Sequence, residues 1–382
     1  MTKLLYICID IYLKVTLIIF AVDFYHYLLD RYSRFHIGRF KNEDEWKQRV
    51  IKKSVKWLKK EPTVKFTDNN RYIILDMLTK KYRNSTVQSW QKGALLLGLQ
   101  KYGSKYEKEI QQCINKLINK KGEFIDPPTN VDCGFLSYAI LKNSNPLDVE
   151  PAMTYSLNLI MNNIGKDGMI CYINDKESTE RYVDTIGLVI PFLFAYAEAY
   201  HIPEIKKSAL VQLKLFTEYG LDKVSLLPNH AFDSRSKLPL GVLGWGRGCA
   251  WYVIGLLDSY LELKEDENCE WIRQQIRIIA EEYKKYQRKD GGFGYIFQMR
   301  YGYDSSATSV MAYFYKKCYD IFGNKTYYDI YISCLKKLKE VTKINGALDW
   351  CQGDTKGIGI FSQTFGIMPF AQGIMIRSFE EN

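Results

Sequence analysis

Six apolar stretches of helical length recur along the chain, separated by roughly 40 to 60 residues. They occupy residues 89–102, 131–141, 182–200, 244–263, 303–319 and 362–379. The segments between them carry apolar residues on one face only, with charged residues on the other. A helix that is apolar nearly all round is buried on both sides, whereas a one-faced helix covers a surface. The pattern therefore predicts an all-α fold of six helical hairpins in two concentric rings, an (α/α)6 barrel.

The first forty residues differ from this pattern. Residues 1–40 form an apolar leader, and residues 41–382 hold the repeat as a single domain. Asp10, Lys14 and Asp23 interrupt the apolar run, and charges in the middle of a span make membrane insertion unfavourable. Asp10 and Lys14 can pair at helical spacing. We therefore expect a helix that packs on the domain or lies on a membrane surface, rather than a span or a cleaved signal peptide.

Basic residues after the apolar run of the leader indicate where in the cell the main domain lies. Arg31, Arg34, Arg39 and Lys41 come directly after the apolar run. If the leader does span a membrane, cations on this side keep the main domain in the cytoplasm. We expect a cytoplasmic protein, with contact to the inner face of the membrane as the alternative.

Each apolar stretch carries its polar or aromatic residues near its beginning. If the six helices lie side by side in a ring, these ends converge on one opening. The residues concerned are Trp90, Asp132, Asp184, Trp245 with Arg247, Asp304 with Ser306, and Gln363.

Composition narrows the class of ligand. Aromatic residues make up 14% of the chain, with 29 Tyr and 7 Trp, and aromatic faces suit sugar rings as well as helix interfaces. The net charge of +10 favours polyanions, but no nucleic-acid motif accompanies it. Nine Cys without Cys-x-x-Cys pairs and four dispersed His predict neither a disulfide framework nor a zinc site. We expect an acidic oligosaccharide or polysaccharide as partner, with no nucleic acid.

Two aspartates are candidates for acid catalysis. Asp184 precedes a nearly all-apolar helix, and Asp132 holds the equivalent place in the second repeat. Each is either a helix N-cap or a carboxylic acid at the edge of a low-dielectric pocket, where burial favours the protonated form. Two carboxylates at converging helix ends are typical of glycoside chemistry.

The segment from residue 230 to residue 251 contains the densest group of candidate binding residues. His230 and Asp233 precede a loop, and Trp245, Arg247 and Trp251 begin the next apolar helix. A guanidinium beside indole rings suits a sugar that bears a carboxylate. The structural alternative is an Arg that binds the carbonyls of a neighbouring segment.

The motifs YVDTIGLVIPFL, HAFD, GWGRGCAWYVIGLLD and DSSATSVMAY, in this order, resemble the unsaturated glucuronyl and rhamnogalacturonyl hydrolases of glycoside hydrolase families 88 and 105. The resemblance extends from about Trp46 to the C-terminus. It implies an (α/α)6 barrel and substrates with a C4=C5 double bond, and it implies no metal or organic cofactor.

The resemblance also implies roles for individual residues. Asp184 would protonate the vinyl ether and then accept a proton from the water that adds, and Asp132 would be the second carboxylate. The sugar site would be formed by His230, Asp233, Trp245, Arg247, Trp251, Trp90, Asp304 and Ser306.

Two departures from the family pattern lie near the expected sugar site. Asp304-Ser305-Ser306 replaces the family's acidic-Thr-Ser run. The family's usual Trp after the Asp-Gly turn is replaced around Gly292-Phe293-Gly294. The chain is also similar to proteins of exopolysaccharide biosynthesis, which implies a glycan being made instead of degraded. The alternative function is thus a non-hydrolytic glycan-binding or assembly protein. A sugar epimerase is disfavoured, because His230 alone among the four His stands in a suitable loop.

Overall fold

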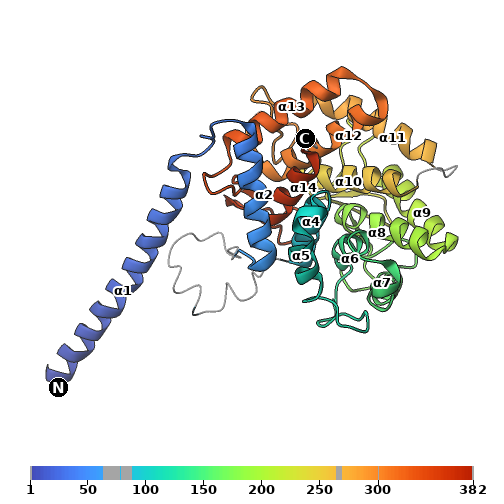
Figure 1. The fold of residues 1–382 in the computed structure, drawn as a ribbon. Helices are drawn as coiled ribbons and strands as arrows, with labels where there is room; N and C mark the ends of the chain where they lie inside the picture. The colour runs from blue at the N-terminus through green and yellow to red at the C-terminus, as the bar shows by residue number, and fades with distance from the viewer. Residues whose placement is uncertain (1, 63–77, 79–87, 264–268, 300, 381–382) are drawn as a thin grey trace.

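The computed structural model describes residues 2–62, 78, 88–263, 269–299 and 301–380. Its helices alternate between an inner and an outer ring (Figure 1). The inner ring consists of α4 (Ser89–Gln100), α6 (Cys133–Lys142), α8 (Asp184–Tyr200), α10 (Gly246–Leu263), α12 (Ser305–Phe322) and α14 (Pro369–Ser378). The outer ring consists of α2 (Glu43–Lys59), α5 (Gly103–Ile114), α7 (Pro146–Met161), α9 (Pro203–Tyr219), α11 (Cys269–Tyr283) and α13 (Lys325–Glu340). The predicted (α/α)6 barrel is confirmed.

The inner ring is closed. Each inner helix packs against the next one, and α14 packs against α4 to complete the circle. At that junction the two backbones nearly touch, because a Cβ atom added at Gly98 would lie 2.3 Å from the Gly373 carbonyl oxygen. Glycine at both positions therefore lets the ring close.

Burial explains why the two kinds of helix differ in sequence. In α8 every residue from Asp184 to Ala197 is buried, since the helix contacts its neighbours and the outer ring at once. In the outer helix α11 only the positions at three- and four-residue spacing are buried, and the remaining surface is charged. The pattern of apolar positions thus distinguishes the helices of the inner ring from those of the outer ring.

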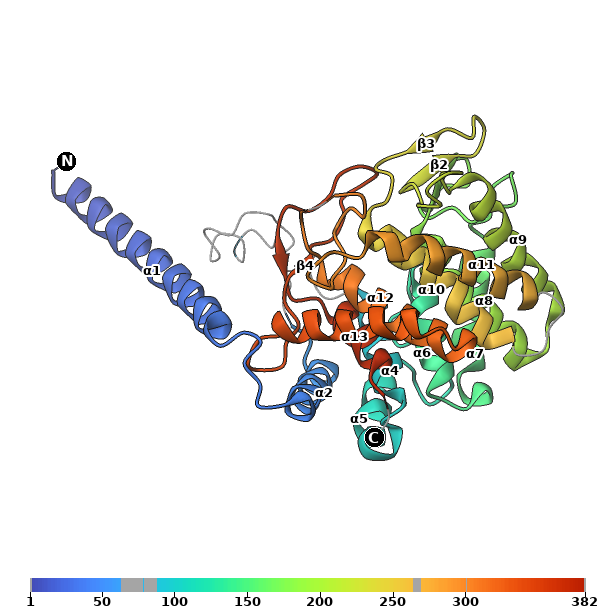
Figure 2. The ribbon, with the colours of Figure 1, turned by 90° about the horizontal axis from the view of Figure 1, so that it is seen from above.

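Short strands and loops lie at the end of the barrel where the inner helices begin (Figure 2). The antiparallel sheet β1 (Glu180–Tyr182), β2 (Ala231–Asp233) and β3 (Pro239–Leu240) pairs Arg181 with Phe232 and Phe232 with Pro239. A second pair joins β4 (Cys351–Gln352) to β5 (Phe365–Gly366). The segment from residue 353 to residue 364 connects β4 to β5.

The sixth inner helix begins later than the apolar pattern predicts. Residues 362–368 are not helical, because Phe365 and Gly366 pair with β4, and α14 starts at Pro369. Proline is favoured in the first turn of a helix and disfavours helical conformation in the residue before it. Gln363 consequently lies in the β4–β5 loop and is exposed.

The leader forms one long helix, α1 (Thr2–Phe35), that projects from the barrel (Figures 1 and 2). None of the residues in its most apolar stretch is buried, so the structure does not pack this helix on the barrel, which was one of the two arrangements expected from the sequence. The predicted pairing of Lys14 with Asp10 is present at 2.7 Å. By length and composition the helix could cross a membrane.

Candidate functional site

A cavity of about 240 Å³ opens at the end of the barrel where the inner helices begin. Its walls come from the first turns of α4, α8 and α10, from β1 and the segments flanking the small sheet, and from the loop after β4. Of the predicted site residues, the cavity wall contains Trp90, Asp184, His230, Arg247 and Trp251. It also contains Gln88, Tyr172, Ile173, Tyr182, Leu188, Asp354, Thr355, Lys356 and Gly357.

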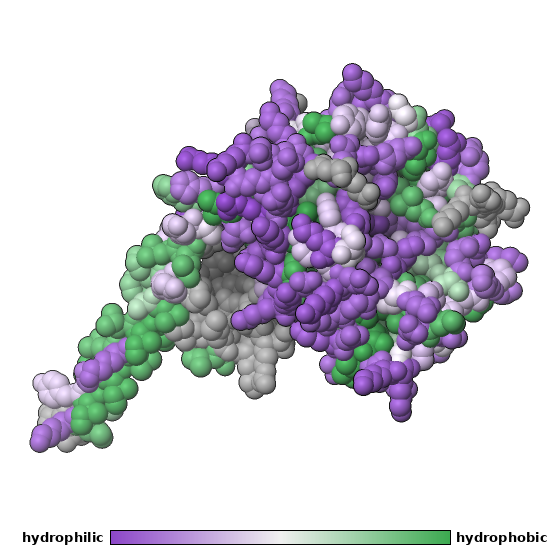
Figure 3. Space-filling model, in the orientation of Figure 1, coloured by the Kyte–Doolittle hydropathy of each residue, from purple (hydrophilic) through white to green (hydrophobic). Residues whose placement is uncertain are grey.

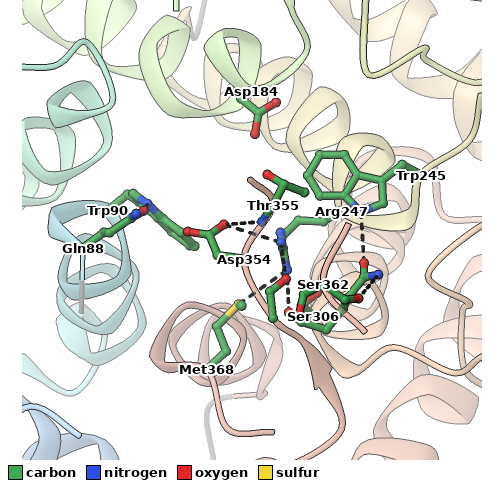
Figure 4. A network of polar contacts seen from close by, with 12 residues as sticks. Gln88, Trp90, Asp184, Trp245, Arg247, Ser306, Asp354, Thr355, Ser362 and Met368 are labelled. Atoms are coloured by element: carbon green, nitrogen blue, oxygen red, sulfur yellow. Dashed lines mark hydrogen bonds and ion pairs between the residues drawn. The ribbon is translucent and has the colours of Figure 1, made fainter. Parts of the chain in front are cut away.

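Asp184 is the first residue of α8 and points into this cavity. Val183 occupies the N-cap position of α8, so the N-cap alternative does not describe Asp184. The residue is only 7% exposed, yet among the described residues its Oδ2 atom has no hydrogen-bond partner. Figure 4 shows the carboxylate directed toward the space between Asp354 and Trp245. A buried polar atom without a partner is unfavourable for stability, so this carboxylate is placed for a ligand.

His230 is an ionisable neighbour of Asp184. Its Nε2 atom lies 3.5 Å from Asp184 Oδ2, too far for a strong hydrogen bond. Its Nδ1 atom accepts from the Gly359 backbone N–H at 3.4 Å. Because Nδ1 accepts, the neutral ring carries its proton on Nε2, the nitrogen that faces Asp184. The imidazole can therefore donate to the carboxylate after a small shift of either side chain.

Two further carboxylates influence the same region. Burial raises the pKa of Asp354 and the negative charge of Asp184 raises it further, against the opposing effect of Arg247, whose Nη2 atom lies 3.6 Å away. Burial and the charge of Asp354 raise the pKa of Asp132 to about 6. Asp132 lies outside the cavity wall, at the position before α6, and makes no capping bond with its side chain. Burial and like charge therefore favour the protonated forms of Asp132 and Asp354.

Tyr172 adds a neutral donor to the cavity. Burial raises the pKa of its phenol well above the usual value, and the charges of Asp184, Asp132 and Asp354 raise it further. The hydroxyl therefore keeps its proton at physiological pH and is available as a hydrogen-bond donor.

Arg247 fixes the wall of the cavity formed by the β4–β5 loop. Its Nη1 atom donates to the Gln352 carbonyl at 2.7 Å, and its Nη2 atom donates to the Gly353 carbonyl at 2.8 Å. The side chain is 1% exposed. Arg247 thus binds the carbonyls of a neighbouring segment, as the structural alternative predicted. These bonds place Asp354 beside the cavity (Figure 4).

Indole rings line and support the site. Trp90 and Trp251 pack edge to face, with ring centroids 5.5 Å apart, and both form part of the wall. Trp245 is not part of the wall; it packs against His230 with centroids 4.7 Å apart and donates from Nε1 to Gln352 Oε1 at 3.1 Å. Trp245 thus holds His230 and the loop in place.

Three predicted site residues have structural partners instead. Asp233 accepts hydrogen bonds from the Arg235 and Ser236 amides and from the Thr179 and Ser236 hydroxyls in a turn outside the cavity. Asp304 caps α12, since its Oδ1 accepts from the Ser306 amide, and the Ser306 hydroxyl donates to Oδ2 at 2.7 Å. Both Asp304 and Ser306 are fully buried and do not line the cavity.

The sequence analysis missed Asp354, Tyr172 and Tyr182. Asp354 follows the short strand β4 instead of beginning a helix, so a search at helix ends could not find it. The available signal was the run Gln-Gly-Asp-Thr-Lys-Gly at residues 352–357, which is polar and glycine-rich between two apolar segments.

The cavity contains His and Asp side chains, which are potential metal ligands. Within the described part of the chain, however, no group of three or more His, Cys, Asp or Glu residues is placed to hold a metal ion. The site is therefore best described by its carboxylates, its imidazole and its aromatic walls.

Solved structures with the same fold include several carbohydrate-active proteins. A possible member of family GH105 from Salmonella enterica serovar Paratyphi A is 17% identical, with a TM-score of 0.71 over 89% of this chain and 94% of its own. A possible GH105 member from Klebsiella pneumoniae is 16% identical, with a TM-score of 0.72 over 89% and 93%. An unsaturated glucuronyl hydrolase from Bacillus sp. GL1 is 14% identical, with a TM-score of 0.61 over 87% and 95%. At these identities the likeness shows the fold.

Sequence comparison gives the family. A search of functionally curated proteins finds no match to this chain. The model of Glycosyl Hydrolase Family 88, in contrast, matches residues 50–319, which include Asp132, Asp184, His230 and Arg247. This range covers well over half of the chain and five of the six inner helices. The chain therefore belongs to glycosyl hydrolase family 88.

Proposed function

We propose that this protein is a glycoside hydrolase that removes a terminal unsaturated uronic acid from an oligosaccharide by hydrating its C4=C5 double bond. The observation that carries the proposal is Asp184, a buried carboxylate that faces a cavity between aromatic and acidic residues and whose Oδ2 has no hydrogen-bond partner in the described part of the chain. The similar structure from Bacillus sp. GL1 is described as an unsaturated glucuronyl hydrolase responsible for the degradation of glycosaminoglycan, which supports the substrate class.

Asp184 is the group proposed to transfer the proton. In its protonated form it gives its proton to C4, and the positive charge that develops at C5 is shared with the ring oxygen. Water then adds to C5 and returns a proton to the Asp184 carboxylate. The resulting hemiketal opens to a ketone, which leaves C1 as a hemiacetal that releases the remaining oligosaccharide. The net change is the addition of one water molecule, and Asp184 is regenerated.

The neighbouring side chains support this sequence. His230 can donate to the Asp184 carboxylate formed after the first step and orient it toward the incoming water. The beginnings of α4, α8 and α10 carry the positive ends of their helix dipoles at this opening, which favours an anionic sugar. Trp90 and Trp251 offer apolar surface to the sugar ring.

The test follows the ultraviolet absorbance of the C4=C5 bond, which is conjugated with the carboxylate. Purified protein is incubated with a panel of unsaturated disaccharides that differ in uronic acid, linkage and sulfation. We expect wild type to bleach at least one of them and Asp184→Asn to be slower by about 10²- to 10⁴-fold, the usual contribution of a general acid–base group. Asp329→Asn, which changes an exposed acid on the outer helix α13, serves as the matched control and retains the wild-type rate.

An unchanged absorbance over the whole panel, with folding verified by circular dichroism, would overturn the proposal. Calorimetry on the same panel then decides what replaces it. Binding without turnover would favour the alternative of a non-hydrolytic glycan-binding or assembly protein in exopolysaccharide biosynthesis.

A further inference from the structure

Helix α1 carries exposed apolar side chains on all of its sides, interrupted by the charged pair Asp10 and Lys14. Leu4, Leu5, Tyr6 and Ile7 project in four directions around the helix, and each is at least 55% exposed. The space-filling view shows a mostly apolar rod, interrupted by hydrophilic residues, that leaves a largely hydrophilic barrel (Figure 3). A helix that lies on a membrane surface or pairs with one partner helix keeps a polar face. An apolar surface on every side requires an apolar environment on every side.

The apolar part of α1 matches the thickness of a bilayer. Residues 4–22 rise by about 28 Å at 1.5 Å per residue, which is close to the hydrocarbon thickness of a typical membrane. The charges inside this stretch are Asp10 and Lys14, and they form an ion pair at 2.7 Å. Pairing with an opposite charge is one way in which ionisable residues are accommodated within membrane spans. Asp23 then marks the end of the apolar stretch.

The residues that follow resemble a membrane boundary. Tyr25, Tyr27 and Tyr32 are all exposed, and tyrosine gathers at the level of the lipid headgroups. The Arg31 guanidinium lies 5.1 Å from the centroid of the Tyr27 ring. The cations after the apolar stretch, Arg31, Arg34, Arg39 and Lys41, outnumber the single Lys3 before it. Such an excess of cations marks the cytoplasmic side of a span.

We propose that α1 spans a phospholipid bilayer once and holds the barrel on its cytoplasmic face. The junction between helix and barrel suits an anchor, because it is fixed by specific contacts. Arg34 Nε donates to Asp349 Oδ2 at 2.6 Å, and Asp349 is fully buried in the barrel. The Gly38 amide donates to the Thr342 carbonyl at 2.9 Å. Gly38 has a φ of +72°, and a Cβ atom there would lie 2.6 Å from the Glu340 carbonyl oxygen, so only glycine fits.

Fractionation of cells that express the full chain with a carboxyl-terminal fluorescent protein tests the proposal. We expect the wild-type chain in the membrane pellet after washing with alkaline carbonate, and in solution only after detergent. The double variant Leu13→Arg/Leu17→Arg places two unpaired cations in the middle of the span and should lower the ratio of pelleted to soluble protein by at least about tenfold. Val224→Arg adds a cation at an 88% exposed apolar position of the barrel and leaves the wild-type distribution unchanged.

Other outcomes would overturn the proposal. Release of wild type by carbonate alone would indicate a helix that lies on the membrane surface. Wild type that is soluble without detergent would show that α1 has another environment, such as a second copy of this chain. Loss of α1 from the mature protein, seen by mass spectrometry of the intact chain, would identify a signal sequence. Protease digestion of the barrel in intact spheroplasts, with a cytoplasmic control protein protected, would contradict the proposed orientation.

Discussion

The two ends of the barrel differ in whether their buried carboxylates are paired with a cation. At the end where the inner helices finish, Arg377 donates to both oxygens of the fully buried Asp258, at 2.7 and 2.8 Å, and also to the Tyr313 hydroxyl. At the end where they begin, Asp184 has an oxygen with no hydrogen-bond partner among the described residues, and its carboxylate neighbours carry like charge. Both groups lie within the same ring of helices.

The cluster of Asp258 and Arg377 stabilises the fold, whereas the Asp184 carboxylate remains available to a ligand. A buried charge with a bidentate partner stabilises the arrangement of the helices that carry it, and removal of the partner leaves an uncompensated charge. A buried charge without a partner lowers stability and keeps its bonding capacity for a ligand. The contrast therefore predicts opposite results when the two ends are mutated.

The largest effect is expected on the rate at the open end. Asp184→Asn removes the proton donor while leaving the shape of the cavity, so we expect the hydrolysis rate to fall by about 10²- to 10⁴-fold. The free energy of unfolding should stay within about 1 kcal/mol of wild type or rise, since the change removes a buried charge. Urea denaturation measured beside the absorbance assay checks both. A large loss of stability would mean that Asp184 is structural.

The reverse is expected at the paired end. Arg377→Met leaves Asp258 buried without its partner and should reduce the free energy of unfolding by about 3–5 kcal/mol. Circular dichroism during thermal or urea unfolding measures this change. The matched control is the double variant Arg377→Met/Asp258→Leu, in which no uncompensated charge remains, so at least half of the lost stability should return. If the double variant were as unstable as the single one, packing rather than charge pairing would hold this end together.

Asp132 allows the open end to be examined through pH. Its pKa is raised from 3.8 to about 6 in the folded protein, so the folded state binds more protons than the unfolded state between these values. The free energy of unfolding should therefore fall as the pH rises through this window. Asp132→Asn removes the effect and should stabilise the protein by on the order of 1–3 kcal/mol at pH 8, but hardly at all below pH 4. Equal stabilisation at both pH values would contradict the raised pKa.

The smallest effect concerns the aspartate that caps a helix. Asp304→Ala removes the acceptor for the Ser306 amide and should lower the free energy of unfolding by about 1–2 kcal/mol. Asp304→Asn keeps an acceptor oxygen and should cost less. Urea denaturation of the two variants side by side measures the difference, and equal losses would indicate that the charge matters more than the cap.

Asp184 and Asp304 also show where prediction from sequence stops. Both stand immediately before or at the start of an inner helix, so their sequence contexts are alike. Only the structure distinguishes the one that caps its helix from the one that faces a cavity, because the choice depends on the direction of a side chain. The ring architecture, in contrast, was predictable, since it follows from how many faces of each helix are apolar.

Asp354 could not be found in this way, because the chain reaches the cavity at this point through a loop. Its position depends on the guanidinium of Arg247, which lies more than a hundred residues earlier in the sequence. Local patterns report helices and turns, but they do not report which distant segment a loop meets. The same limit explains why Asp233 was expected in the site although it belongs to a turn beside it.

Arg247 holds its side of the cavity through the main-chain carbonyls of Gln352 and Gly353. Every amino acid offers the same carbonyl, so this attachment does not depend on which side chains the loop carries. The positions that follow, the half-buried Thr355 and the exposed Lys356, can therefore be substituted without loosening the wall. Substitutions at these two positions can thus change the surface that the wall presents to a ligand while the attachment to Arg247 persists.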